Sequence, residues 1–201
     1  MNENVKTIFK AEADAIASIP VDQDFEGIIQ LLHSRIHQNG GKVIASGMGK
    51  AGQVANNIAT TFSATGTPAI FLHPSEAQHG DLGIIRENDV LIVLSNSGKT
   101  REIIELVDLT EQLHPDLPVV LITGNVEGEL LHKAKFTLFT GNPPEVCPLG
   151  LTPTTSTTVM MVIGDTLTVL LMKIINFSAA DYAKRHHGGY LGEKLRNGKL
   201  S

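Results

Sequence analysis

Cysteine is almost absent from this sequence, because Cys147 is the single one in 201 residues. One cysteine cannot form an internal disulfide, and Cys147 has no neighbouring thiol with which to build a cysteine metal site. Free cysteines are usually buried, so we expect Cys147 to be a structural thiol.

Positive charge is also in short supply. The chain has 16 Lys and Arg against 21 Asp and Glu, which gives a formal net charge of -5 at pH 7. Nucleic acids and anionic membranes favour basic surfaces, so neither is expected as a partner. An anionic substrate would need a local positive site.

The sequence lacks an obvious targeting signal or membrane span. Residues 1–10 contain no apolar stretch of the kind found in secretory signals, which predicts a cytoplasmic protein. The apolar segment 159–175 is short and is interrupted by Gly164, Asp165 and Lys173. We therefore expect it to be a helix buried in the core or in a subunit interface.

Apolar residues recur with two different periods along the chain. Helical spacing predicts two helices within residues 1–40, the second ending at Gly40 and Gly41. Short apolar runs predict strands at 43–46, 69–72, 90–94, 119–122 and 136–139, and helical patterns lie between several of them at 52–63, 101–113 and 127–133. A long helix is expected near 156–175, followed by a short one.

This alternation of strands and helices predicts an α/β fold with a doubly wound, five-stranded parallel sheet. The expected architecture is a flavodoxin-like or Rossmann-like three-layer sandwich in one domain over residues 1–201. Helices at 1–40 precede a core at 41–195. Ligands on such sheets bind at the carboxyl ends of the strands.

The first strand is followed by the letters GMGKAG at 47–52, which satisfy the glycine pattern of dinucleotide-binding folds. That interpretation also needs an acidic residue at the end of the second strand. The second strand ends at His73 and Pro74 instead, and Glu76 lies beyond the proline. A nicotinamide dinucleotide site is therefore not expected.

The third strand is followed by SNSGKT at 95–100, which resembles a P-loop only in its last letters, because Val93 stands where the first glycine belongs. The turn offers the hydroxyls of Ser95, Ser97 and Thr100 at a helix N-terminus, where free amides favour a phosphate. A plainer interpretation is equally open: Ser95 and Ser97 form the turn, and Thr100 caps the helix.

A run of motifs in a fixed order resembles one family. The motif Ser-x-Ser-Gly-x-Thr is similar to the phosphosugar-binding turn of SIS (sugar isomerase) domains. Further motifs resemble the arabinose-5-phosphate isomerases of the Kdo pathway: GMGK at 47–50, TGTP at 65–68, HPSEA at 73–77, HGDLG at 79–83, SNSG at 95–98, CPLG at 147–150 and PTTST at 153–157.

The resemblance implies an isomerase that interconverts D-arabinose 5-phosphate and D-ribulose 5-phosphate and supplies Kdo for lipopolysaccharide or capsule. It implies no cofactor and a homotetramer. Many members carry C-terminal CBS domains, so the chain is expected to be the short form without them. The resemblance also allows a non-catalytic SIS module that senses a phosphosugar or CMP-Kdo, or an isomerase of hexose phosphates.

The family's catalytic positions fall on Lys50, Glu102, Glu145 and His186. Lys50 would stabilise phosphate or enediolate charge, and its plainer role is a solvated surface lysine. Either Glu102 or Glu145 would move the proton, although a carboxylate at position 102 is also favoured by the helix dipole. His186 would open the sugar ring.

Substrate-contacting positions of the family fall on Gly66, Thr67, His73 and His79, in addition to the serine-rich turn. The resemblance makes His73 the contact for an inhibitory zinc ion, but one imidazole is a poor zinc site, so no metal is expected to be required.

Three departures from the family pattern bear on the site. His187 replaces the usual proline, so it competes with His186 for the ring-opening role. Ala51 replaces a common serine and removes a hydroxyl. Lys99 and Arg101 bring two positive charges to the serine-rich turn, where they would tighten it or admit a more anionic ligand.

Overall fold

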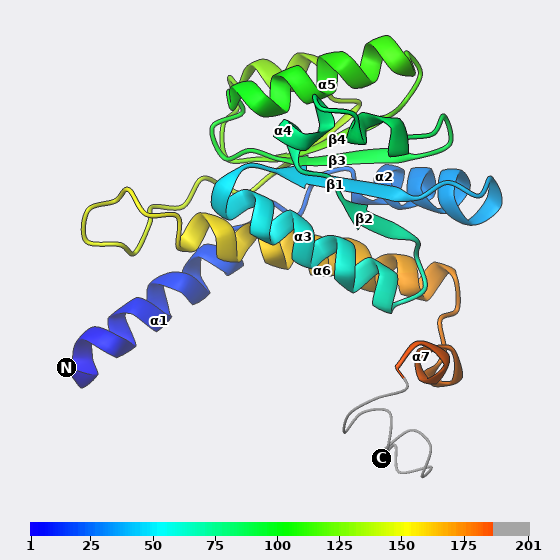
Figure 1. Cartoon of the computed structure of the whole chain (residues 1–201). Coiled ribbons are helices and arrows are strands. Elements are labelled where there is room, and N and C mark those ends of the chain that lie inside the picture. Colours follow the sequence, from blue (N-terminus) through cyan, green and yellow to red (C-terminus); the bar gives the residue numbers. More distant parts are fainter. Residues whose placement is uncertain (187–201) are drawn as a thin grey trace.

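Five parallel strands form the centre of the protein in the computed structural model, which describes residues 1–186 (Figure 1). They are β1 (Val43–Gly47), β2 (Ala69–Phe71), β3 (Val90–Leu94), β4 (Val119–Thr123) and β5 (Phe136–Phe139). Their order in the sheet is β2-β1-β3-β4-β5, and every neighbouring pair is parallel. The predicted doubly wound parallel sheet is confirmed.

Helices cover both faces of the sheet (Figure 1). One face is covered by α2 (Phe25–Leu32), α3 (Gly49–Ala64) and α6 (Thr155–Ile174), and the other by α4 (Pro74–Ala77) and α5 (Arg101–Leu113). Successive strand residues point to opposite faces. Val43 and Ala45 therefore pack in one core, while Ile44 packs in the other.

Helix α6 is long and apolar enough to span a membrane by length and composition alone. Its buried residues include Met160, Ile163 and Leu167, which belong to the core under the sheet. Gly164 faces α3, because a Cβ at this position would collide with the side chain of Ile58. The helix packs as a core element, as the sequence predicts.

The N-terminal helix projects from the body of the protein (Figure 1). This helix, α1 (Asn2–Ala17), has the expected apolar spacing, but Ala15 is its one buried residue. Val5, Ile8 and Phe9 are 39%, 46% and 69% exposed. The apolar face of α1 is thus left largely uncovered by residues 1–186.

Helix α2 continues as a π-helix, η1 (His33–Gln38), and stops before the two glycines, as predicted. The connection between β4 and β5 differs from the sequence prediction. In place of an α-helix over 127–133, there is one 3₁₀ turn, η3 (Glu129–His132), in which only Leu130 is buried. One anchoring residue does not support a longer amphipathic helix.

Two short elements lie in the segment after β2, where the sequence predicts none: α4 and the 3₁₀ helix η2 (Asp81–Ile84). Elements of one turn carry too little periodicity to be detected from sequence. The short helix expected after α6 is α7 (Ala179–Arg185), which begins at a capping box between Ser178 and Asp181.

Candidate active site

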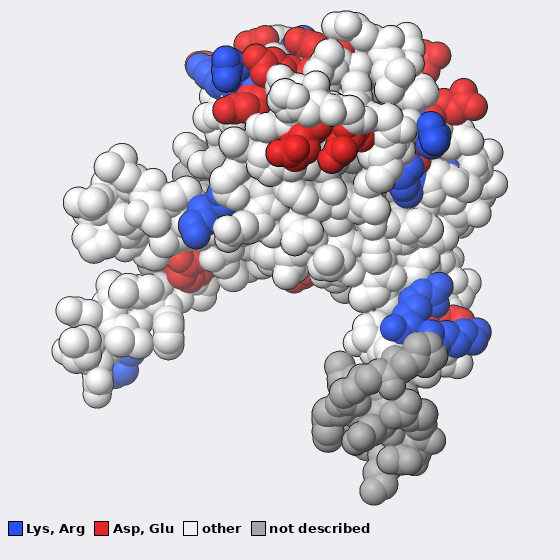
Figure 2. Space-filling view, viewed as in Figure 1, with Lys and Arg blue, Asp and Glu red and all other residues white. Residues whose placement is uncertain are grey.

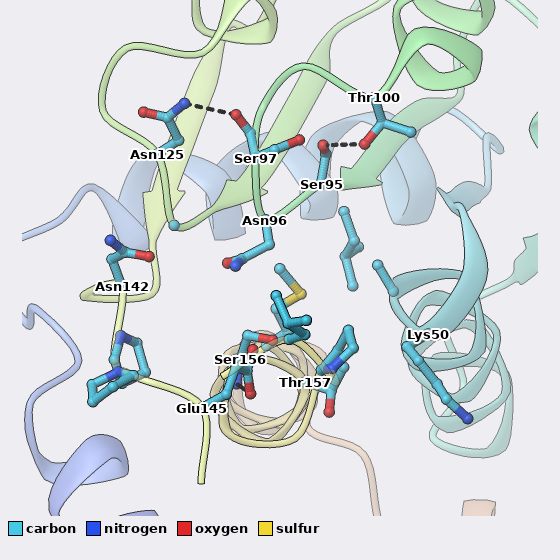
Figure 3. A pocket seen from close by; sticks show the side chains of 18 of the residues that line it. Lys50, Ser95, Asn96, Ser97, Thr100, Asn125, Asn142, Glu145, Ser156 and Thr157 are labelled. Atoms are coloured by element: carbon cyan, nitrogen blue, oxygen red, sulfur yellow. Dashed lines mark hydrogen bonds between the residues drawn. The ribbon is translucent and has the colours of Figure 1, made fainter. Parts of the chain in front are cut away.

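A cavity of about 900 Å³ lies at the carboxyl end of the sheet. Its walls come from the turn after β1, the turn after β3, the start of the β4–β5 connection, the N-terminus of α6 and the loop 141–153, which we call the cavity loop. Figure 3 shows these groups facing a common space. The position agrees with the rule that ligands bind at the carboxyl ends of parallel strands.

The turn between β3 and α5, residues 95–100, forms one wall, and we call it the phosphate turn. Ser95 is 2% exposed, and its hydroxyl pairs with that of Thr100 at 2.8 Å (Figure 3). The Ser97 side chain is exposed, and the residue's carbonyl accepts a hydrogen bond from Asn125 at 2.7 Å. Thr100 occupies the N-cap position of α5, as the plainer interpretation expects, but its hydroxyl makes no cap bond to the helix.

Gly98 shapes the phosphate turn. Its φ of +62° favours glycine, and a Cβ at this position would stand 2.9 Å from the Cα of Gly128. The backbone can therefore turn sharply from β3 into α5. Because no side chain caps α5, its first amides remain available to an anion.

Glu145, in the cavity loop, faces the phosphate turn from the opposite wall (Figure 3). Its Oε2 accepts hydrogen bonds from the amide of Thr154 at 2.7 Å, the hydroxyl of Thr154 at 2.8 Å and the amide of Ser156 at 3.3 Å. Partial burial pushes the pKa of Glu145 upward, but the hydrogen bonds from Ser156 and Thr154 outweigh it and hold the pKa below its ordinary value. The site therefore contains an ionised carboxylate.

Lys50 lies in the first turn of α3 at the edge of the cavity. Its side chain is exposed, and in Figure 3 its amino group extends away from Ser95 and Glu145. The glycines on either side of Lys50 have a packing role, which accounts for the dinucleotide-like pattern. A Cβ on Gly52 would stand 2.5 Å from the carbonyl oxygen of Gly47, so this turn needs glycine to close on itself.

The cavity is also lined by three asparagines that were not predicted from the sequence: Asn96, Asn125 and Asn142 (Figure 3). Asn96 belongs to the phosphate turn, and Asn125 and Asn142 add amide donors and acceptors beside it. Two of them carried a usable signal, because Asn96 stands between the two predicted serines and Asn125 follows the carboxyl end of β4. Asn142 has a φ of +50° and belongs to the cavity loop, which has no periodic pattern.

Glu102, His73 and His79 are not part of the cavity wall. Glu102 lies half-buried in the first turn of α5. His73 caps α4, because its Nδ1 accepts from the amide of Ser75 at 3.3 Å. His79 is exposed on the segment after α4. Helix α4 packs against α5, so these three residues occupy one region beside the cavity.

Gly66, Thr67 and His186 lie at the other end of the molecule. Gly66 and Thr67 follow α3, whose 16 residues carry the chain about 24 Å from Lys50. His186 follows α7, beyond the far end of α6 from the cavity loop (Figure 1). Its ring stacks on Tyr182 with the centroids 3.6 Å apart, and Nδ1 lies 3.0 Å from the Tyr182 carbonyl oxygen.

The second residue of the histidine pair, His187, lies outside the described residues. Within residues 1–186, no three metal-binding side chains gather closely enough to hold a metal ion. The predicted inhibitory zinc contact at His73 stays a prediction.

Cys147 lies in the cavity loop and is partly exposed, which differs from the buried thiol expected from composition. Hydrogen bonds from the Thr152 hydroxyl and from the amides of Thr152, Leu149 and Leu151 lower its pKa to about 6. The thiol is therefore largely ionised at neutral pH.

Comparison with known sequences gives this geometry a family. The SIS domain profile matches residues 36–170. An arabinose 5-phosphate isomerase, KdsD, from Francisella tularensis is 41% identical over 197 residues, which cover 97% of this chain and 59% of the relative. The chain therefore spans less than two thirds of the length of that curated relative.

Solved structures extend the likeness to three dimensions. A candidate phosphosugar isomerase involved in capsule formation from Bacteroides fragilis is 55% identical, with a TM-score of 0.93 over 94% of this chain and 99% of that one. The c3406 protein of Escherichia coli CFT073, in complex with arabinose 5-phosphate, is 32% identical, with a TM-score of 0.83 over 90% of this chain and 95% of that one. This chain belongs to the SIS domain family.

Proposed function

We propose that this chain is an aldose–ketose isomerase that interconverts D-arabinose 5-phosphate and D-ribulose 5-phosphate for Kdo biosynthesis. One observation carries the proposal: the phosphate turn and an ionised Glu145 face each other across one cavity. The 41% sequence identity with KdsD of Francisella tularensis and the arabinose 5-phosphate complex of the related c3406 protein support the choice of a five-carbon substrate.

The phosphate turn is suited to the phosphate group of the substrate. It combines the exposed Ser97 hydroxyl, the Thr100 hydroxyl and the uncapped amides of α5. Helix N-termini favour phosphate because free amides and the helix dipole meet there. In this proposal the sugar extends from the phosphate turn towards Glu145.

Proton transfer is assigned to Glu145 rather than Glu102, because Glu145 lines the cavity and Glu102 does not. The amide and hydroxyl of Thr154 and the amide of Ser156 hold Oε2, and in this assignment Oε1 takes the proton from the carbon beside the carbonyl. Returning that proton to the adjacent carbon of the enediol completes the isomerisation. Glu102 acts near the phosphate end in this assignment.

Lys50 stabilises the charge that develops on the carbonyl oxygen. Its four-carbon side chain is free to rotate at the cavity edge, and a mobile ammonium can close on substrate once the phosphate is bound.

A complete site needs a second copy of the chain. Helix α6 has 20 residues and so separates Glu145 from the region of His186 by about 30 Å. We place His186, Gly66 and Thr67 of one subunit against the cavity of another, within a homotetramer. The surface over α3 and α6 carries few charged side chains, unlike the acidic surface over α5, which suits a contact between subunits (Figure 2).

The reaction is tested by incubating the folded protein with ribulose 5-phosphate and identifying the product by NMR. Appearance of arabinose 5-phosphate is the expected result. A well-folded sample that gives no turnover is evidence against the enzyme and leaves the non-catalytic phosphosugar sensor, which retains binding. Equal or faster turnover of hexose phosphates instead identifies an isomerase of six-carbon substrates.

The shared site is tested by subunit mixing. Glu145→Gln and His186→Ala proteins are each expected to be inactive alone. Unfolded together and refolded, they form some sites with both residues intact, so activity should return in part. If the mixture stays inactive although mixed oligomers form, the two residues do not meet across subunits.

CMP-Kdo is proposed as a regulatory ligand of the same cavity. A volume of about 900 Å³ lies within the range that accommodates ligands larger than a pentose phosphate. Competitive inhibition of isomerisation by CMP-Kdo tests this assignment. The cytoplasm is the compartment expected for an enzyme with these ligands.

A further inference from the structure

The cavity loop that carries Glu145 is fastened at both ends by the N-terminal part of the chain. At its start, the side chain of Gln23 accepts a hydrogen bond from the amide of Phe139 and donates one to the Phe139 carbonyl oxygen. At its end, Glu12 of α1 contacts Thr155, the first residue of α6. Gln23 and Phe139 are 116 positions apart in the sequence, and Glu12 and Thr155 are 143 positions apart. These two long-range contacts lie on either side of the loop.

Glu12 reaches the backbone beside Glu145 through one hydroxyl. The Thr155 Oγ1 donates to Glu12 Oε1 at 3.1 Å and accepts from the amide of Val146 at 3.1 Å. A hydroxyl has one proton, so donation to Glu12 points its lone pairs towards Val146. Thr155 is 1% exposed, so water does not readily replace either partner.

The other oxygen of Glu12, Oε2, is buried without a hydrogen bond within residues 1–186, which costs free energy in the folded protein. Buried polar atoms are nearly always paired, and an exception calls for an explanation. Ala15 also packs α1 against the body, so attachment of the helix does not rest on the Glu12 contact alone.

We propose that Glu12 is a positioning residue: through the Thr155 hydroxyl it fixes the backbone of Val146 and so sets where the Glu145 carboxylate stands in the cavity. The catalytic consequence rests on the proposed isomerase function. The positional consequence does not, because the surroundings of Glu145 can be measured without turnover.

The experiment compares five single variants with the wild-type protein. Glu12→Ala and Thr155→Val remove the contact, whereas Glu12→Gln and Thr155→Ser keep an acceptor and a hydroxyl. Asp14→Ala is the matched control, because Asp14 lies on the same helix, is exposed and pairs only with Lys10 among residues 1–186. Circular dichroism and size-exclusion chromatography establish that each variant is folded and assembled.

The first readout is the titration of Glu145, followed by NMR with glutamate labelled with ¹³C at the side-chain carboxyl carbon. The signal is assigned by its loss in Glu145→Gln. We expect the Glu145 pKa to rise in Glu12→Ala and Thr155→Val, because a displaced loop weakens the bonds from Thr154 and Ser156. It should stay unchanged in the two conservative variants and in Asp14→Ala.

The second readout is kinetic. We expect Glu12→Ala and Thr155→Val to lower kcat by about ten- to a hundredfold with KM within about twofold, because small misplacements of a reacting group act on the chemical step. The double variant should be no worse than the poorer single one, since both changes break the same path. If the Glu12–Thr155 contact only attached α1, its removal would lower the melting temperature and leave kcat and the Glu145 titration unchanged.

The outcomes separate the two proposals. If the wild-type protein does not isomerise the substrate, the proposed function fails, while the NMR titration still tests the positioning role. An unchanged Glu145 pKa in folded Glu12→Ala, or additive losses in the double variant, overturns the positioning role. If Glu12→Ala does not fold, the pair Thr155→Val and Thr155→Ser carries the same comparison.

Discussion

Glu145 and Thr154 are joined twice, because the amide and the hydroxyl of Thr154 both donate to the same carboxylate oxygen, at 2.7 and 2.8 Å. The pair lies at the N-terminus of α6, where the helix dipole favours negative charge. The arrangement keeps Glu145 ionised and fixed in orientation, as a proton acceptor requires.

Replacing Glu145 with glutamine should abolish most of the proposed isomerase activity while preserving the fold. Glutamine retains the shape and one acceptor but cannot take a proton, so kcat should fall by at least about a hundredfold. Steady-state kinetics with ribulose 5-phosphate measure the effect. Glu26→Gln, an exposed change on α2, is the control and should be near wild type. Near-normal turnover of Glu145→Gln would assign the proton transfer elsewhere.

Lys50→Ala should reduce kcat by about a hundredfold or more, since a cation facing a developing oxyanion contributes to the transition state. The melting temperature should hardly change, because Lys50 is exposed and forms no ion pair within residues 1–186. Lys6→Ala is the matched control on α1. A loss confined to KM would indicate that Lys50 binds the phosphate instead.

Acid should remove a stabilising contribution of Glu145. The pKa of Glu145 is lower in the folded protein than in the unfolded chain. Its ionised form therefore stabilises the folded state fully at pH values above the unfolded pKa. This stabilisation is lost as the pH falls through the folded pKa. Urea unfolding of wild type and Glu145→Gln at several pH values measures this. The difference in the free energy of unfolding should shrink as the pH falls below about 4.5. A difference independent of pH would contradict the lowered pKa.

Cys147 should react with iodoacetamide in its thiolate form at neutral pH. The labelling rate should rise with a midpoint near pH 6, against about 8.5 for an unperturbed cysteine. Thr152→Val removes the hydroxyl that contributes most to the shift and should move the midpoint upward. Mass spectrometry after timed labelling gives the rates. A wild-type midpoint near 8.5 would show that the loop does not hold the thiolate.

Much of the fold followed from local patterns. The strand at 90–94 and the helix at 101–113 match β3 and α5 at both ends, because a continuous apolar run and a clear helical period each act over neighbouring residues. The phosphate turn between them was found for the same reason. The helix expected at 127–133 was wrong, since its apolar residues do not have enough buried surface to cover.

The candidate site was predicted less completely. Lys50, Ser95, Ser97, Thr100 and Glu145 do line one cavity, but Gly66, Thr67 and His186 lie at the far end of the molecule and His73 caps a helix. The roles of these residues and the short, single-domain form stay predictions. No sequence pattern marked Asn142 or Glu12 as part of the site, because neither lies in a recognisable turn or at a strand end.

Local patterns are enough to predict the order of the elements, the parallel sheet and the two turns that border the cavity, because apolar period and turn chemistry act within a few residues. The resemblance to the family rests on the ordered motifs. Tertiary packing is needed to bring the cavity side chains together and to place Glu12 against Thr155, 143 positions away. Helices of 16 and 20 residues carry the chain across the sheet, so positions close in sequence end up at opposite edges and distant ones meet.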